Sequence, residues 1–118
     1  MTKHANHIDF IEFPAMSPEG IEGAKAFYSS IFGWTFKDWG TEYADTSSSG
    51  VGTGFNADLS NRPNQPLAVI YTPELEATME KVNAAGGTIT KDIFSFPGGR
   101  RFHFIDPAGN ELAAWSDK

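Results

Sequence analysis

The sequence contains no cysteine, and this absence removes several kinds of chemistry. A disulfide, a thiolate nucleophile and a cysteine-bound metal are all excluded, which leaves His, Asp and Glu as the side chains suited to metal binding. Basic residues are also few, because 9 Lys and Arg stand against 15 Asp and Glu, giving a net charge of -6. An acidic surface repels a phosphate backbone, so we expect no binding to nucleic acid.

Long apolar runs are missing as well. The first residues, MTKHANH, have no apolar signal core, and no segment has the length needed to cross a bilayer. We therefore expect a cytoplasmic protein with no membrane partner. What the chain does contain is 10 Phe, 3 Tyr and 3 Trp among 118 residues, which can form the core of a single domain covering residues 1–118.

The first half of the chain predicts one strand, one helix and three more strands. Residues 8–13 are mainly apolar and aromatic. Ser17-Pro18-Glu19 then supplies a helix cap, a proline at the first helical position and an acidic first turn. An apolar stripe with spacings of three and four follows, and Gly33 ends the helix. Short strands are predicted at residues 34–36, 42–46 and 51–55. This order is βαβββ.

The second half repeats this order. Leu67–Tyr71 is a predicted strand, Thr72-Pro73-Glu74 repeats the cap, and Gly86-Gly87 ends the second helix. Further strands are predicted at residues 88–93, 101–105 and 111–115. The two modules, at about residues 7–57 and 66–116, are joined by a polar, proline-containing linker. Neither module can bury its helix stripe and one sheet face alone, so we expect both to pack into one domain.

Two segments and the duplicated order carry a family resemblance. AKAFYSSIFGW (residues 24–34) and GRRFHFIDPAGNELAAW (residues 99–115) resemble the vicinal oxygen chelate superfamily of glyoxalases, bleomycin resistance proteins and extradiol dioxygenases. The resemblance implies an α+β fold of two tandem βαβββ modules that form a cup-shaped, half-open mixed sheet. It also implies a small-molecule cavity in the cup, a divalent metal at its floor and a homodimer.

The resemblance further implies that the metal ligands come from the first and last strand of each module. Carried onto this sequence, these positions are Phe10, Leu67 and Ala113, with the fourth within residues 51–55. None offers a side chain suited to a divalent cation, and a metal site requires several such donors. We therefore predict no metal and no other cofactor.

Two carboxylates lie close to these positions along the strands. Because strand side chains alternate in direction, Glu12 shares a face with Phe10, and Glu111 shares a face with Ala113. In an aromatic cavity either carboxylate could act as a general acid or base or as a hydrogen-bond partner for a ligand. Alternatively, Glu12 forms an ion pair with Arg or Lys, and Glu111 lies at a solvated rim.

His103 and Trp115 complete the set of cavity candidates. His103 is predicted to point away from Phe102 and Phe104, as a proton shuttle or as a half-buried structural residue. Trp115 could stack against a planar ligand or belong to the core. Residues 95–100 are predicted to form a loop able to cover the cup mouth. The predicted cavity residues are Phe10, Glu12, Leu67, His103, Glu111, Ala113 and Trp115.

The leading hypothesis for function is a glyoxalase-like protein without the family metal that binds a small organic molecule in an apolar cup. A second hypothesis is a metal-dependent lyase or dioxygenase with an unusual ligand set: His7, Glu12, His103 and Glu111. A third is a non-catalytic dimeric interaction protein whose cup is filled by its own aromatic side chains. Strand alternation argues against the second, because His7 and Glu12 point to opposite faces.

Overall fold

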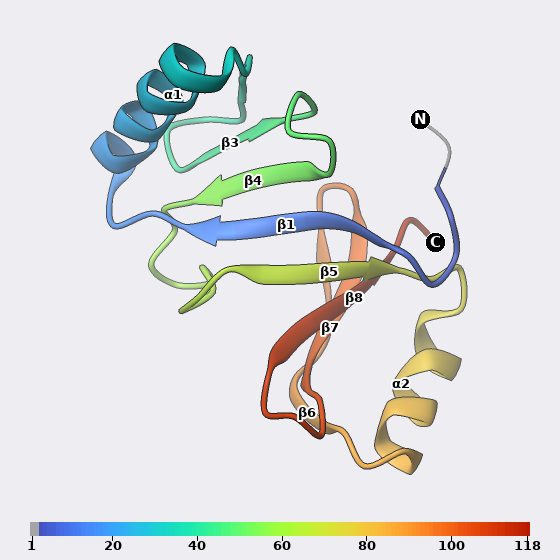
Figure 1. Cartoon of the computed structure of the whole chain (residues 1–118). Coiled ribbons are helices and arrows are strands. Elements are labelled where there is room, and N and C mark those ends of the chain that lie inside the picture. The colour runs from blue at the N-terminus through green and yellow to red at the C-terminus, as the bar shows by residue number, and fades with distance from the viewer. Residues whose placement is uncertain (1–2) are drawn as a thin grey trace. The chain divides into compact units, whose positions relative to one another are not determined.

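The computed structural model describes residues 3–118, and the contacts within it divide the chain into two units. The N-terminal unit is Phe10–Leu67. The C-terminal unit is Ala68–Lys118 together with the described residues up to Asp9. Each unit combines a helix with strands of a mixed sheet, as Figure 1 shows. That the two modules make up one domain stays a prediction. No helix among residues 3–118 is long and apolar enough to cross a membrane.

The N-terminal unit contains the predicted first βαβββ order. Its elements are β1 (Ile8–Pro14), α1 (Pro18–Phe32), β2 (Lys37–Asp38), β3 (Tyr43–Thr46) and β4 (Gly52–Asn56). The strands lie in the order β2-β3-β4-β1, with β1 parallel to β4 and the other pairs antiparallel. The cap signals act as predicted: Ser17 Oγ accepts from Gly20 N–H at 3.1 Å, and Gly33 adopts the left-handed conformation that ends α1.

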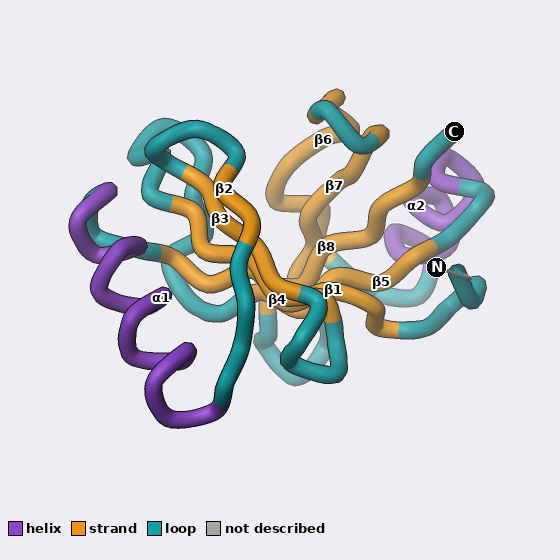
Figure 2. The backbone as a smooth tube through the Cα atoms, turned by 90° about the horizontal axis from the view of Figure 1, so that it is seen from above, coloured by secondary structure: helices purple, strands orange, loops and turns teal. Residues whose placement is uncertain are grey.

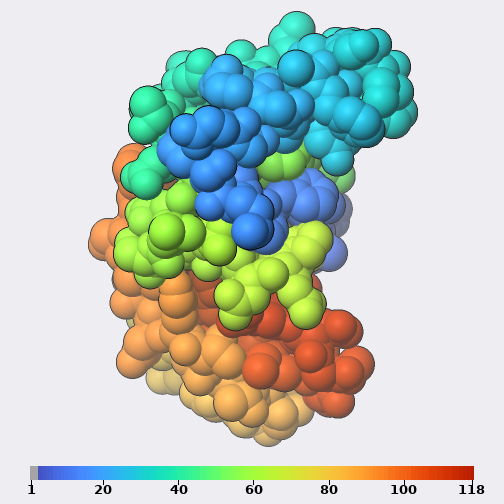
Figure 3. Space-filling view, turned by 90° about the vertical axis from the view of Figure 1, so that its left-hand side faces the viewer, coloured from blue at the N-terminus to red at the C-terminus, as the bar shows by residue number. Residues whose placement is uncertain are grey.

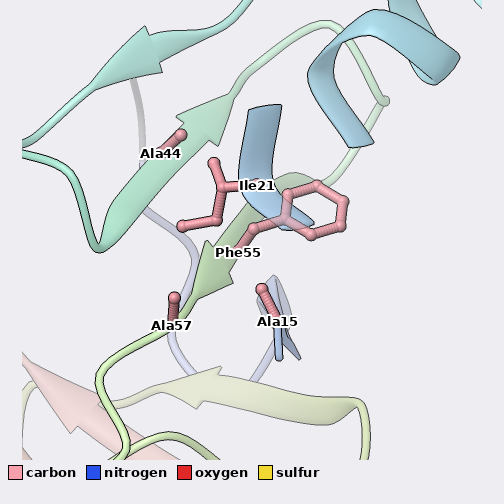
Figure 4. Packing of buried hydrophobic residues seen from close by; sticks show 5 residues of the cluster. All are labelled: Ala15, Ile21, Ala44, Phe55 and Ala57. Carbon is pink, nitrogen blue, oxygen red and sulfur yellow. The ribbon is translucent and has the colours of Figure 1, made fainter. Parts of the chain in front are cut away.

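The core of this unit lies between α1 and one face of its sheet. Ile21 of α1 points toward Ala44 of β3 and Phe55 of β4 (Figure 4). Phe13 stacks on Phe55 with ring centroids 5.4 Å apart. The outer side of α1 forms the surface of the unit seen in blue and cyan in Figure 3. Because strand side chains alternate, the neighbours of these core residues point to the other face of the sheet.

The C-terminal unit repeats the arrangement with different lengths. Its elements are β5 (Leu67–Tyr71), α2 (Leu75–Ala84), β6 (Thr88–Phe96), β7 (Gly99–Ile105) and β8 (Glu111–Ser116). Figure 2 shows these strands, which lie in the order β5-β8-β7-β6. The first β1 residues and the segment before them join this unit, since Asn6 and His7 exchange backbone hydrogen bonds with Tyr71.

The core of the C-terminal unit lies under α2. Leu75, Phe102 and Ala114 are buried there, and Met79, Val82, Ile89, Ile93 and Phe104 pack against them. Full burial of a Phe side chain such as Phe102 contributes about 1.5–3 kcal/mol. Residues that alternate with Phe102 and Ala114 point away from α2, so Arg101, His103, Ala113 and Trp115 share one face.

Three local predictions were wrong. Residues 34–36 are not a strand, because their polar backbone atoms bond to side chains: Trp34 O accepts from Ser29 Oγ and Thr35 N donates to Ser48 Oγ. Thr72 does not cap α2, since its hydroxyl accepts from Glu74 N–H and the helix begins only at Leu75. Residues 95–100 are not a covering loop but a tight hairpin, in which Ser95 pairs with Arg100 and Phe96 with Gly99.

Candidate functional site

We call the side of the N-terminal sheet that faces away from α1 the α1-distal face. Its residues are Phe10, Glu12, Tyr43, Gly54 and Asn56. The carboxylate-bearing side chain of Glu12 is buried, with 2% of the residue exposed. Tyr43 hydroxyl donates to Glu12 Oε1 at 3.1 Å, and Asn56 Nδ2 lies 3.4 Å from Oε2. The buried acid thus has hydrogen-bond donors at both oxygens, as a buried carboxyl requires.

Gly54 makes room for this arrangement. It pairs with Glu12 across the β1–β4 ladder. A Cβ atom at this position would lie 2.3 Å from Tyr43 Oη and 2.8 Å from Phe10 Cζ, both too close. The groups that approach this glycine closely are therefore the protein's own aromatic rings.

We call the side of the C-terminal sheet that faces away from α2 the α2-distal face. His103 lies at its centre and is 2% exposed. Burial, with the positive charges of Arg101 and Lys91 adding to it, lowers the pKa of His103 from 6.5 to about 3. His103 is therefore neutral at physiological pH. Its Nε2 atom is buried and has no hydrogen-bond partner among the described residues.

Glu111 is the acidic neighbour of this histidine. Its Oε2 atom lies 3.7 Å from His103 Nδ1 and accepts a hydrogen bond from Thr90 hydroxyl at 2.7 Å. The Glu111 side chain is 38% exposed, so solvent screens its charge. This explains why burial and the nearby cations outweigh the carboxylate in setting the pKa of His103.

Aromatic rings surround the histidine on the same face. The Phe94 ring centroid lies 5.6 Å from that of His103, and the guanidinium of Arg101 lies over both Phe94 and Phe96. Phe96 and Trp115 have ring centroids 6.2 Å apart, and Trp115 Nε1 donates to Asp9. The lining is therefore mainly aromatic and includes the guanidinium of Arg101, and within it His103 Nε2 has no hydrogen-bond partner among residues 3–118.

The predicted cavity residues fall on both units. Phe10 and Glu12 lie on the α1-distal face, and His103, Glu111, Ala113 and Trp115 lie together on the α2-distal face. Leu67 is buried at the start of β5. His7 belongs to the segment that pairs with Tyr71, and its exposed ring stacks on His4.

The residues do not fit the family metal. The three ligand positions implied by the resemblance, Phe10, Leu67 and Ala113, carry hydrocarbon side chains. Among residues 3–118, no group of three or more His, Asp or Glu side chains is arranged to hold a metal ion. His103 and Glu111 provide two donors on one face, fewer than metal sites use.

Several conspicuous residues have structural roles. Asp106 Oδ1 accepts from the backbone N–H groups of Ala108 and Asn110, each at 2.9 Å, and the Asn110 bond above all holds the pKa of Asp106 below its usual value. The DPAGN segment is therefore a self-bonded turn before β8. Arg100 forms a two-pronged ion pair with Glu76, and Trp34 stacks on Tyr28 of α1.

Sequence reasoning missed the partners of the buried groups. Tyr43 was assigned only to a predicted strand and Asn56 only to the end of the first module. Thr90 and Lys91 were assigned only to the strand predicted at residues 88–93, and Phe94 lay just beyond it. Strand alternation would have placed Tyr43 opposite to Ala44, on the Glu12 side. Strand alternation could not have placed Lys91 and Phe94 in the same way, because β6 contains two register shifts between Ile89 and Phe94.

Known proteins share this arrangement. Residues 6–114 match the family model of the Glyoxalase/Bleomycin resistance protein/Dioxygenase superfamily. No curated protein matches the sequence. Among solved structures, the NAD-dependent benzaldehyde dehydrogenase from Legionella pneumophila aligns with a TM-score of 0.73 and 12% identity over 92% of this chain and 98% of that chain.

Two further structures are similar. A glyoxalase/bleomycin resistance protein/dioxygenase superfamily member from Vibrio splendidus 12B01 gives a TM-score of 0.67 and 14% identity over 91% of this chain and 96% of that one. Methylmalonyl-CoA epimerase from Mycobacterium tuberculosis gives a TM-score of 0.66 and 12% identity over 98% of this chain and 91% of that chain. Such low identities show the fold alone, which is the predicted α+β class. By its family match over nearly the whole chain, this protein belongs to the glyoxalase/bleomycin resistance/dioxygenase superfamily.

Proposed function

We propose that this protein binds a small organic molecule on the α2-distal face of its C-terminal unit, without a metal held by the protein. The observation that carries the proposal is His103, a buried side chain whose Nε2 atom has no hydrogen-bond partner among residues 3–118. Leaving a buried polar atom unpaired costs about 1–3 kcal/mol, so each such atom calls for an explanation, and a ligand that supplies the missing partner is one.

The surroundings of His103 support a ligand with apolar area. Phe94, Phe96 and Trp115 are each only partly buried, and with buried Ala113 they present hydrocarbon surface near His103. Small-molecule sites have this character: mostly apolar walls and a few polar groups that fix orientation. Membership of a superfamily that includes glyoxalases and dioxygenases is in keeping with a small-molecule role.

The proposal is tested by mapping aromatic probes onto the protein. In two-dimensional amide NMR spectra, toluene and anisole at millimolar concentrations should shift the resonances of β7 and β8 near His103 and Ala113. Resonances of α2, on the opposite side of the sheet, serve as the internal control. Shifts spread evenly over both sides, or no shifts at all, would contradict a site on the α2-distal face.

A second candidate function is a metal-dependent lyase or dioxygenase, favoured by the 3.7 Å distance between His103 Nδ1 and Glu111 Oε2. Elemental analysis of the purified protein, followed by calorimetric titration with Zn, Ni, Mn and Fe, separates the two candidates. One metal ion bound with submicromolar affinity, and lost in Glu111→Ala, would overturn the metal-free proposal. The expected result is no stoichiometric metal.

A further inference from the structure

We infer that the ligand is a planar aromatic molecule bearing a neutral hydroxyl or N–H group, and that this group donates a hydrogen bond to His103 Nε2. The inference rests on the proposed function and names the chemistry of its ligand. It depends on which ring nitrogen carries the proton, on the charges around that nitrogen, and on the rings that share its face.

Glu111 decides the tautomer of His103. A carboxylate can only accept hydrogen bonds, and its Oε2 atom lies 3.7 Å from Nδ1. A lone pair on Nδ1 would face this oxygen with repulsion, whereas an N–H group is attracted to it. Thr90 holds the same oxygen with a hydrogen bond of 2.7 Å. Nδ1 therefore carries the proton, and Nε2 of the neutral ring presents a lone pair.

The lone pair at Nε2 selects among ligand groups. A carboxylate has no proton to donate, so it cannot make this hydrogen bond even though Lys91 and Arg101 attract its charge. An ammonium group can donate, but Lys91 pairs with His103 across the β6–β7 ladder and Arg101 lies two residues away on the same face. These two cations disfavour a third positive charge in a buried place. A neutral hydroxyl or N–H donor is the group that remains.

The neighbouring rings determine the shape of the rest of the ligand. The two register shifts in β6 bring Lys91 opposite His103 and Phe94 opposite Arg101. The Phe94 ring is tilted by 51° relative to His103, and Phe96 by 55° relative to Trp115. Aromatic edges and faces at such angles favour offset or edge-to-face contact with another ring. A phenol has both the ring and the donor.

The experiment compares phenol, anisole and benzylamine on the intact protein. Phenol and anisole have nearly the same shape, but anisole has no donor, and benzylamine carries a charged one. We expect phenol to bind about tenfold more tightly than anisole, the range of one hydrogen bond, and benzylamine to bind more weakly than anisole. Affinities are measured by NMR titration of the β7 and β8 amides.

The histidine itself provides a second readout. A long-range ¹H–¹⁵N spectrum of the free protein should show His103 as the neutral ring protonated at Nδ1, and phenol should shift its Nε2 resonance while anisole does not. The signal is assigned by its loss in His103→Phe. A ring protonated at Nε2, or an Nε2 signal insensitive to phenol, would overturn the inference.

Variants separate this inference from the proposed function. In His103→Phe the preference for phenol over anisole should disappear, whereas the control His7→Phe, which removes an exposed histidine, should keep it. Equal binding of phenol and anisole at the α2-distal face would refute the ligand chemistry and leave the proposed function standing. If none of the three probes binds there, the proposed function itself fails.

Glu111 acts here as a positioning residue, and this role has its own readout. Glu111→Ala removes the carboxylate beside Nδ1, so the His103 spectrum should show both tautomers. The affinity for phenol should then fall severalfold while that for anisole stays the same. Unchanged tautomers in Glu111→Ala would show that this carboxylate does not orient the ring.

Discussion

The α1-distal face buries Glu12 and the α2-distal face buries His103, and both side chains are 2% exposed; Arg101 is buried beside His103 on the second face. They differ in what surrounds them. Glu12 receives hydrogen bonds from Tyr43 and Asn56, whereas His103 Nε2 has no partner among residues 3–118. Equal burial thus does not imply an equal role. A satisfied group stabilises the fold, and an unsatisfied one is a candidate for ligand binding.

We expect the largest loss of stability when Glu12, the buried group with hydrogen-bond partners, is replaced. Glu12→Ala removes the carboxylate that accepts from the Tyr43 hydroxyl and from Asn56 Nδ2, which keeps Asn61 as a second acceptor, and it leaves a void in the carboxylate's place. The free energy of unfolding should fall by about 3 kcal/mol, measured by urea denaturation. Glu111→Ala is the matched control at a partly exposed carboxylate and should change it by only about 0.5 kcal/mol. A larger loss in the control would reverse our assignment of roles.

The next largest effect concerns the space around Glu12. Gly54→Ala places a methyl group within 2.3 Å of Tyr43 Oη and 2.8 Å of Phe10 Cζ. The forced movement of these rings should cost about 1–3 kcal/mol in thermal or urea unfolding. Gly23→Ala in α1 meets no atom within 4 Å and should instead stabilise the protein by roughly 0.5–1 kcal/mol. Similar effects at both glycines would show that Tyr43 is not held in place.

Measuring stability as a function of pH tests the role of His103, the group of this comparison whose Nε2 atom has no partner among the described residues. His103 has a pKa lowered from 6.5 to about 3, so between these values the unfolded chain binds a proton that the folded chain does not. The contribution of His103 to stability is therefore complete above pH 6.5 and is lost progressively as the pH falls toward 3. The groups that face His103 from the neighbouring strands are Lys91, Arg101 and Glu111.

The carboxyl groups with lowered pKa values, Asp58, Glu76, Asp106 and Asp117, also cause acid destabilisation. They protonate at lower pH, so urea unfolding between about pH 5 and pH 7 isolates the histidine contribution. His103→Phe should flatten the slope in that range. A slope that survives in His103→Phe would assign the proton uptake to another group.

Much of the fold followed from local signals. Ser17, Pro18 and Gly33 define α1 because caps depend on residues close in sequence. The same holds for Asp106 in the turn before β8. Locality also explains the failures. Trp34 and Phe36 look like strand residues, but their rings pack around Tyr28 and Phe55, and the strand begins only at Lys37.

The sequence predicted the sheet face on which His103 and Glu111 lie, but not the protonation state of His103. Alternation correctly placed His103 opposite to Phe102 and put Glu111 on the face of Ala113. Alternation does not reveal that β6 shifts register twice, and without those shifts Lys91 would not pair with His103. The neutral state of His103 depends first on burial and then on the nearby charges of Arg101 and Lys91, and all three are set by tertiary structure.

By itself, the sequence determined the two βαβββ modules, the family and the absence of donors at the implied metal positions, because these depend on short-range patterns and on residue identity. The tertiary structure alone decided which buried polar groups are satisfied. Tyr43 and Asn56 lie 31 and 44 residues from Glu12 along the chain, so only folding brings donor and acceptor together. The same long-range packing buries His103 Nε2 without a partner among the described residues.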